Sequence, residues 1–145
     1  MNKYIRDPII AKEKYENLYK ISHKLSKDKY VEFVENSDYF IWLEDTIEGK
    51  QSIKNINLIP ESFRDGFLKA HNKTHACAQF NNYKKFYELT LNFNEEFGII
   101  SSTFQKKITS KDLHVLFDMS KYLDALLLNG VDKDVIDETT IDTIS

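Results

Sequence analysis

The 145-residue sequence is short of glycine and proline and carries a single cysteine. Four glycines and two prolines fall below the usual content of about 7% and 5%, which argues against long flexible linkers. Cys77 alone cannot form a disulfide within the chain. No run approaches the ~18 consecutive apolar residues of a membrane-spanning helix, and the start, MNKYIRDPII, lacks the apolar core of a secretory signal. We therefore expect a cytoplasmic protein without membrane insertion.

Complete catalytic and cofactor signatures are also missing. Four scattered glycines cannot form the phosphate-binding patterns G-x-x-x-x-G-K-[ST] or G-x-G-x-x-G. The formal net charge of −3 argues against a dedicated nucleic-acid binder, because such proteins bind through a clustered basic face. We therefore expect no cofactor, no enzymatic activity and no direct contact with nucleic acid.

The length fits one ordinary domain, which at this size buries roughly 68–70% of its unfolded surface. Acidic residues gather near the C-terminus, where Lys133 is the only basic residue after position 131. Residues 1–131 are expected to form a single domain and residues 132–145 an acidic tail, whose order the sequence leaves open. The acidic residues of this tail are Asp132, Asp134, Asp137, Glu138 and Asp142.

Two helices are predicted in the first 36 residues. Asp7 followed by Pro8 is typical of a helix start, and apolar residues recur at near-helical spacing afterwards, which predicts a helix over about 8–25. Ser26 is a good N-cap for a shorter helix that runs through about Asn36. The two helices are expected to pack as a hairpin.

Aromatic and β-branched residues then predict a hairpin of two strands over 39–46 and 53–59, with a turn near Gly49. Pro60 begins a further helix, whose end is uncertain. Residues 74–80 fit either helix or strand.

The clearest strand signal is the alternation of apolar and polar residues over 85–93, and this strand is expected to form a second hairpin with 98–108. Thr109 or Ser110 caps a strong helix with Asp112 in its first turn, and Asn129 with Gly130 is expected to end it. The resulting order, ααββαββα, predicts an α+β domain with a mainly antiparallel sheet built from two hairpins and packed by helices.

The segment HNKTHACAQF holds two histidines and the cysteine within seven residues. If it is helical, His71 and His75 lie one turn apart, the spacing of paired zinc ligands. A thiolate at Cys77 with a neighbouring histidine as base is a second catalytic hypothesis. Against both, Asn72 stands where a zinc-protease helix has its glutamate, and the flanking alanines favour a buried thiol. The favoured interpretation is core and core edge.

Acidic and aromatic residues offer another kind of site. Glu44 and Asp45 follow the apolar segment that contains Trp42, and Glu95 and Glu96 lie in a predicted turn. Acids of this kind steer association with a basic partner, while aromatic rings supply contact area at low entropic cost. These five residues are the predicted partner-binding set.

A small, mildly acidic α+β domain without a catalytic motif favours a protein that binds another protein. In this general pattern the chain resembles the small immunity proteins of bacterial toxin systems and phage-encoded inhibitors, and its many Lys, Asn and Ile residues are typical of a low-GC genome. The resemblance implies binding to a toxin or effector, such as a basic nuclease domain, by covering its active site. The alternative is a small hydrolase or metal-dependent enzyme centred on His71, His75 and Cys77.

Overall fold

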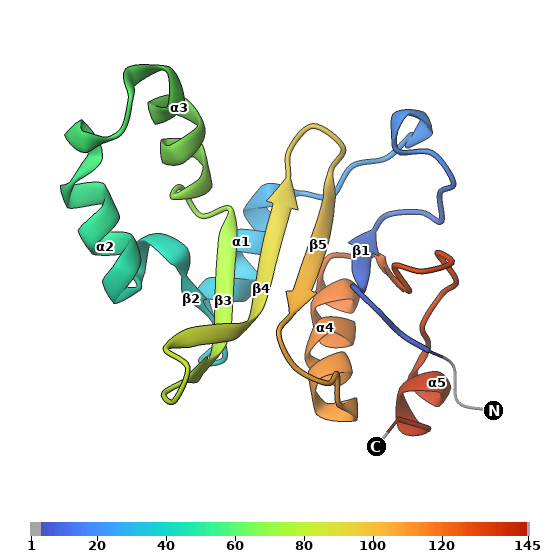
Figure 1. Ribbon diagram of the computed structural model, residues 1–145. Helices are drawn as coiled ribbons and strands as arrows, with labels where there is room; N and C mark the ends of the chain where they lie inside the picture. Colours follow the sequence, from blue (N-terminus) through green and yellow to red (C-terminus); the bar gives the residue numbers. More distant parts are fainter. Residues whose placement is uncertain (1–3, 145) are drawn as a thin grey trace.

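A six-stranded sheet runs through the protein in the spatial order β2-β3-β4-β5-β1-β6. Every neighbouring pair is antiparallel. The structure is a computed structural model that describes residues 4–144 (Figure 1). The strands are β1 (Ile9–Ala11), β2 (Ile41–Trp42), β3 (His75–Asn81), β4 (Phe86–Asn94), β5 (Ile99–Phe104) and β6 (Leu126–Leu128).

The helices cover one face of this sheet and its edges (Figure 1). Two of them, α1 and α4, pack behind the sheet and close the main core. The others lie towards the two edges. The α-helices are α1 (Lys27–Glu35), α2 (Ile47–Lys54), α3 (Glu61–Ala70), α4 (Ser110–Tyr122) and α5 (Glu138–Asp142), and the 3₁₀ turns are η1 (Leu18–Lys20), η2 (Leu43–Asp45) and η3 (Ile56–Leu58).

The main core follows from the alternation of side chains along β4. Leu89, Leu91 and Phe93 are buried against the helical layer, whereas the residues between them face the opposite side. Leu116 of α4 and Tyr30 of α1 meet them from that layer. Burying one such side chain stabilises the folded state by roughly 1.5–3 kcal/mol, so packing between the sheet and these helices is a major contribution to the stability of the fold.

The N-terminus of α4 is fixed by a capping box and a buried carboxylate. Thr109 Oγ1 accepts from the Asp112 amide, and Asp112 Oδ2 accepts from the Thr109 amide at 2.9 Å. Asp112 also forms an ion pair with Lys106 at 2.8 Å and accepts from Gln79 Nε2 at 2.6 Å and from the Tyr39 hydroxyl at 3.3 Å. Gln79 has a φ of 60°, which interrupts the extended backbone of β3 without changing its register with β4. The network therefore joins the helix to the sheet.

The structure confirms the predicted α+β class, with a single domain and an antiparallel sheet. The helices expected after Ser26, Pro60 and Thr109 are present, as are the strands at 85–93 and 98–108, which pair as a hairpin. The segment that fitted either helix or strand is a strand, since β3 begins at His75. Within residues 4–144, no helix is long and apolar enough to cross a membrane.

The helix predicted over 8–25 is wrong. Residues 9–11 form β1, which pairs with β5 on one side and β6 on the other, and the rest of the segment is irregular apart from η1. Asp7 does not cap a helix, because its φ of 48° turns the chain into β1. The irregular segment covers a second apolar cluster on the face of the sheet opposite α4. Its buried members are Ala11, Tyr15, Ile99 and Leu128.

The hairpin predicted over 39–46 and 53–59 is also wrong. Only Ile41–Trp42 is a strand, and it pairs with β3. Thr46 accepts a hydrogen bond from the Gly49 amide at 2.9 Å and so caps α2, which occupies the predicted turn and part of the second predicted strand. The Thr46 cap therefore favours a helix here, although the composition of the segment favours a strand.

The last predicted helix ends earlier than expected. The α-helix stops at Tyr122, Asp124 takes a φ of 53°, and Leu126–Leu128 continues as strand β6 instead of helix. In the acidic segment that follows, Ile136 and Ile141 are buried in the main core, and α5 spans Glu138–Asp142. Of the predicted segments, residues 1–3 and 145 lie outside the described part of the chain.

Candidate functional site

The segment 47–70, called the arm below, extends from the β2 edge of the sheet (Figure 1). It consists of α2, η3 and α3. Within it, Gly49 alone is buried. Large apolar side chains are instead open to solvent: Ile47 is 87% exposed, Leu58 83% and Phe63 67%. The arm therefore keeps several large apolar side chains in water, and exposed apolar surface of this kind is a candidate interaction site.

Backbone contacts hold both ends of the arm against the sheet. At its start, an added Cβ at Gly49 would lie 1.8 Å from the Leu43 carbonyl oxygen, so α2 packs on η2 with no room for a side chain. At its end, the Thr74 hydroxyl donates to the Lys69 carbonyl at 2.8 Å. The arm is therefore placed by its ends, and its middle remains available.

The four predicted acids gather at one end of the sheet. Antiparallel pairing brings the end of β2, the start of β3 and the end of β4 together, so that Glu44 and Glu95 lie on either side of the 71–74 turn. Glu44 Oε2 accepts from the Lys73 amide at 2.6 Å, and its Oε1 is buried with no hydrogen-bond partner among residues 4–144. Glu95 forms an ion pair with Lys27 at 2.5 Å, which lowers the pKa of Glu95.

The remaining predicted residues of the partner-binding set differ in accessibility. Asp45 and Glu96 are exposed at the same end of the sheet. Trp42 is only 6% exposed, and its ring lies edge-on to Tyr30 with centroids 5.6 Å apart. The tryptophan therefore supports the core beneath this end. Exposed aromatic side chains lie elsewhere, with Phe63 on α3 and Phe80, which is 45% exposed, near the other end of β3.

The histidines and the cysteine lie near the same end, on different elements. His71 follows α3, and its Nδ1 lies 2.8 Å from the Phe67 carbonyl, while His75 Nδ1 lies 3.2 Å from the Ala70 carbonyl. Because β3 is a strand, His75 and Cys77 project from the same face. Gln79 departs from that alternation because its φ is 60°, and its side chain reaches Asp112. The helical spacing that would pair the histidines is absent.

The chemistry of these groups gives little support to a thiolate or metal centre. Burial, with a contribution from the Glu44 carboxylate, raises the pKa of Cys77 to about 11, so the group is a neutral thiol at neutral pH. Burial also lowers the pKa of His75. Among residues 4–144, no three His, Cys, Asp or Glu side chains are grouped so that they could hold a metal ion. The thiol therefore acts here as a small apolar side chain.

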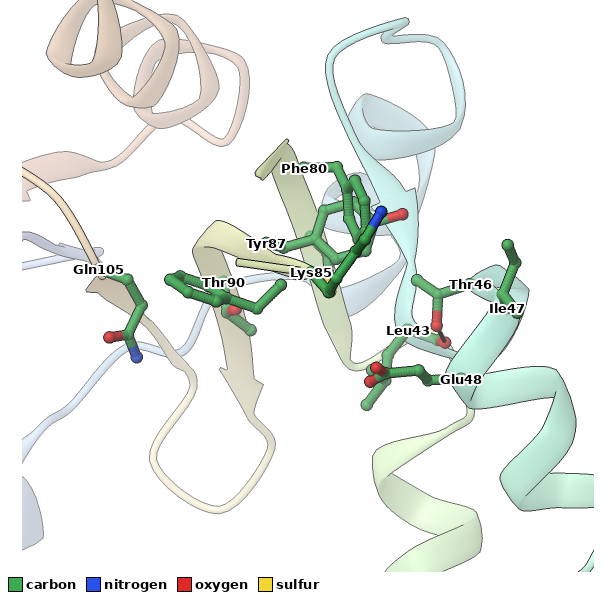
Figure 2. A pocket seen from close by; sticks show the side chains of 11 residues that line it. Leu43, Thr46, Ile47, Glu48, Phe80, Lys85, Tyr87, Thr90 and Gln105 are labelled. Atoms are coloured by element: carbon green, nitrogen blue, oxygen red, sulfur yellow. Dashed lines mark hydrogen bonds between the residues drawn. The ribbon is translucent and has the colours of Figure 1, made fainter. Parts of the chain in front are cut away.

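A cavity of about 720 Å³ lies between the start of the arm and the uncovered face of β3, β4 and β5 (Figure 2). This volume is within the range of small-molecule sites, about 300–1,000 Å³. Leu43 and Ile47 line it on the arm side, while Phe80 and Tyr87 line it on the sheet side. Cys77 and Phe86 also line the cavity, and the rest of the lining is polar or charged: Thr46, Glu48, Lys85, Thr90 and Gln105.

Comparisons with known proteins add no functional information, since no family model, no curated protein and no solved structure matches the chain. Sequence reasoning brought forward the acids and the histidines but missed the arm and the cavity. The sequence carries one signal for the first helix of the arm. Thr46 is a residue type that caps helices, and Gly49, whose amide it accepts from, follows three residues later. The cavity depends on residues more than 60 positions apart and has no local signal.

Proposed function

We propose that the protein is a protein-binding module of the inhibitor or immunity type, which neutralises a toxin or effector by covering its functional surface. The observation that carries this proposal is the arm, in which Gly49 is the only buried residue and no side chain is fully buried. A helix whose apolar side chains stay in water gains little stability from packing, so a partner that covers them provides a physical reason for their presence.

Amphipathic helices bind partners by inserting side chains from one face into an apolar groove. In α3, Phe63 and Phe67 are four residues apart and thus lie on one face, and Phe67 stacks on His71 with ring centroids 4.1 Å apart. Phe63, which is 67% exposed, presents an aromatic ring of the kind that dominates interface energetics. We assign the main contact to Phe63 and Leu58, with Trp42 acting from beneath.

Exposed acidic residues at the end of the sheet where β3 begins support recognition of a basic partner. Asp45 and Glu96 are exposed there, next to the turn that is bound by Glu44 and Glu95. Exposed acids of this kind change the association rate more than the affinity, and salt screens their effect within about 8–10 Å. A decrease in the association rate with added salt is therefore part of the proposal.

The test compares proteins captured from the source organism by the tagged wild type and by single variants. Phe63→Asp and Leu58→Asp each place a charge on the arm. Val131→Asp is the matched control, because Val131 is 57% exposed and lies beyond β6, at the opposite edge of the sheet. We expect one stoichiometric partner with the wild type and the control, and at least a tenfold loss of it with either arm variant.

The captured partner is then assayed for enzymatic or toxic activity with and without added protein. Inhibition by the wild type and by Val131→Asp, but not by Phe63→Asp, is the expected result. A partner that is retained equally by all three variants would refute the arm as the binding surface. A partner whose activity is unaffected would refute the inhibitor function while leaving protein binding intact.

A further inference from the structure

Three lysines take a left-handed backbone conformation, which glycine adopts more readily because it has no Cβ. Their φ values are 54° at Lys73, 65° at Lys85 and 63° at Lys133. Lys73 forms an ion pair with Glu35 at 2.9 Å, and Lys133 donates to the Gly130 carbonyl at 3.0 Å. Lys85 has no such ion pair or hydrogen bond from its ammonium within residues 4–144; its side chain instead lines the cavity.

The β3–β4 turn fixes the position of Lys85. The Asn81 side chain accepts from the amides of Tyr83 and Lys84, and the Lys85 amide donates to the Asn81 carbonyl at 2.7 Å. Figure 2 shows the Lys85 side chain on the same side of the cavity as Phe80 and Tyr87. Lys85 is exposed at the edge of a partly apolar cavity, so its ammonium can pair with the charged group of a ligand whose apolar part lies in the cavity.

We infer that this cavity binds a small organic acid with an aromatic or aliphatic body and a carboxylate. The body lies against Leu43, Ile47 and Phe80, and the carboxylate meets the Lys85 ammonium. Glu48, on the arm side, repels a carboxylate that binds in the reverse orientation. The inference goes beyond protein binding, and its test needs no partner protein.

The experiment is an NMR titration of the ¹⁵N-labelled full chain with 4-phenylbutyrate and with its uncharged amide. We expect saturable shifts of the Cys77 and Thr90 amides, because both residues line the cavity. Since an exposed ion pair adds at most about fivefold in affinity, the acid should bind about three- to fivefold more tightly than the amide.

Variants separate the two parts of the site. Lys85→Asn keeps a residue that tolerates the left-handed conformation, removes the charge, and should abolish the preference for the acid; Lys84→Asn is the matched control one residue away. Glu48→Gln should strengthen binding of the acid and leave the amide unchanged. Thr90→Phe fills the cavity and should weaken both ligands at least tenfold.

Three results would overturn the inference. These are the absence of shifts at Cys77 and Thr90, equal affinity of the wild type for acid and amide, and an equal loss of preference in Lys84→Asn and Lys85→Asn. Because Asn is well tolerated at this turn position, the Lys85 result does not depend on a disrupted fold.

Discussion

The helical layer behind the sheet and the arm beside it are both made of short amphipathic helices, yet they use their apolar residues in opposite ways. In α4, Leu113, Leu116 and Met119 are at most 1% exposed. In the arm, Leu58 and Phe63 are mostly in water. The two regions differ in tertiary packing, from which most helical stability in proteins comes. The first region maintains the fold, and the second is available for binding.

The largest expected contrast comes from one substitution made in both regions. Leu116→Ala leaves a cavity in the main core and should lower the free energy of unfolding by about 2–5 kcal/mol. Leu58→Ala, at 83% exposure, should change it by less than about 0.5 kcal/mol. Urea denaturation followed by circular dichroism measures both values. Equal losses would show that the arm is part of the cooperative core.

A second contrast uses the pH dependence of stability. Burial by itself would raise the pKa of Asp112, but the Lys106 ion pair and the hydrogen bonds from Thr109 and Gln79 lower it overall. A lowered pKa in the folded state stabilises the protein above the unfolded value of about 4, and this contribution is lost as the pH falls through the folded value.

Asp112→Asn should therefore lose about 1–3 kcal/mol at pH 7, and the gap to the wild type should narrow below about pH 4. Asp118→Asn, on the exposed side of the same helix, is the control and should follow the wild type. Unfolding curves measured from pH 3 to pH 7 provide the test. A constant gap across that range would mean that the charge of Asp112 is not what stabilises the network.

The smallest contrast compares two helix caps of the same residue type. Thr109→Ala removes the cap of α4 and should lower the global free energy of unfolding by about 0.5–2 kcal/mol. Thr46→Ala removes the cap of α2. Because the arm has few buried residues, we propose that it opens independently of the core, so the effect should be confined to faster hydrogen exchange in residues 47–54.

Hydrogen exchange read by mass spectrometry, together with urea midpoints, distinguishes the two caps. Thr→Ser at each position keeps the hydroxyl and should restore wild-type behaviour. If Thr46→Ala lowered the global midpoint as much as Thr109→Ala, the proposed independence of the arm would be wrong.

Local signals predicted the parts of the fold that local interactions decide. Ser26 and Thr109 begin helices as their side chains indicate, and the alternation of Leu89 and Leu91 identifies β4. The prediction failed where distant pairing decides. Ile9 pairs with Leu128, and apolar spacing after Pro8 gives no sign of a partner so far along the chain.

In the candidate site, too, local sequence signals predict some features and miss those that depend on distant residues. Antiparallel order brings Glu44 and Glu95 to one end of the sheet, but no sequence pattern indicates that both are engaged, one by the Lys73 amide and one by Lys27. Burial of Trp42 follows from its position above Tyr30, which the sequence alone does not give. The role of these acids in binding a partner stays a prediction.

The position of β1 in the sheet has a consequence for biosynthesis. β1 precedes the other strands of residues 4–144 and lies between β5 and β6, so one of its two neighbours is residues 126–128. A chain emerging from the ribosome can pair β3 with β4 and β4 with β5 early, because these contacts are close in sequence. Closure of the sheet around β1 must wait until β6 has left the exit tunnel. Until then, Ile9 and Ala11 lack the partner strand that pairs with them in the folded protein. During this interval the nascent protein is open to misfolding or to capture by a chaperone.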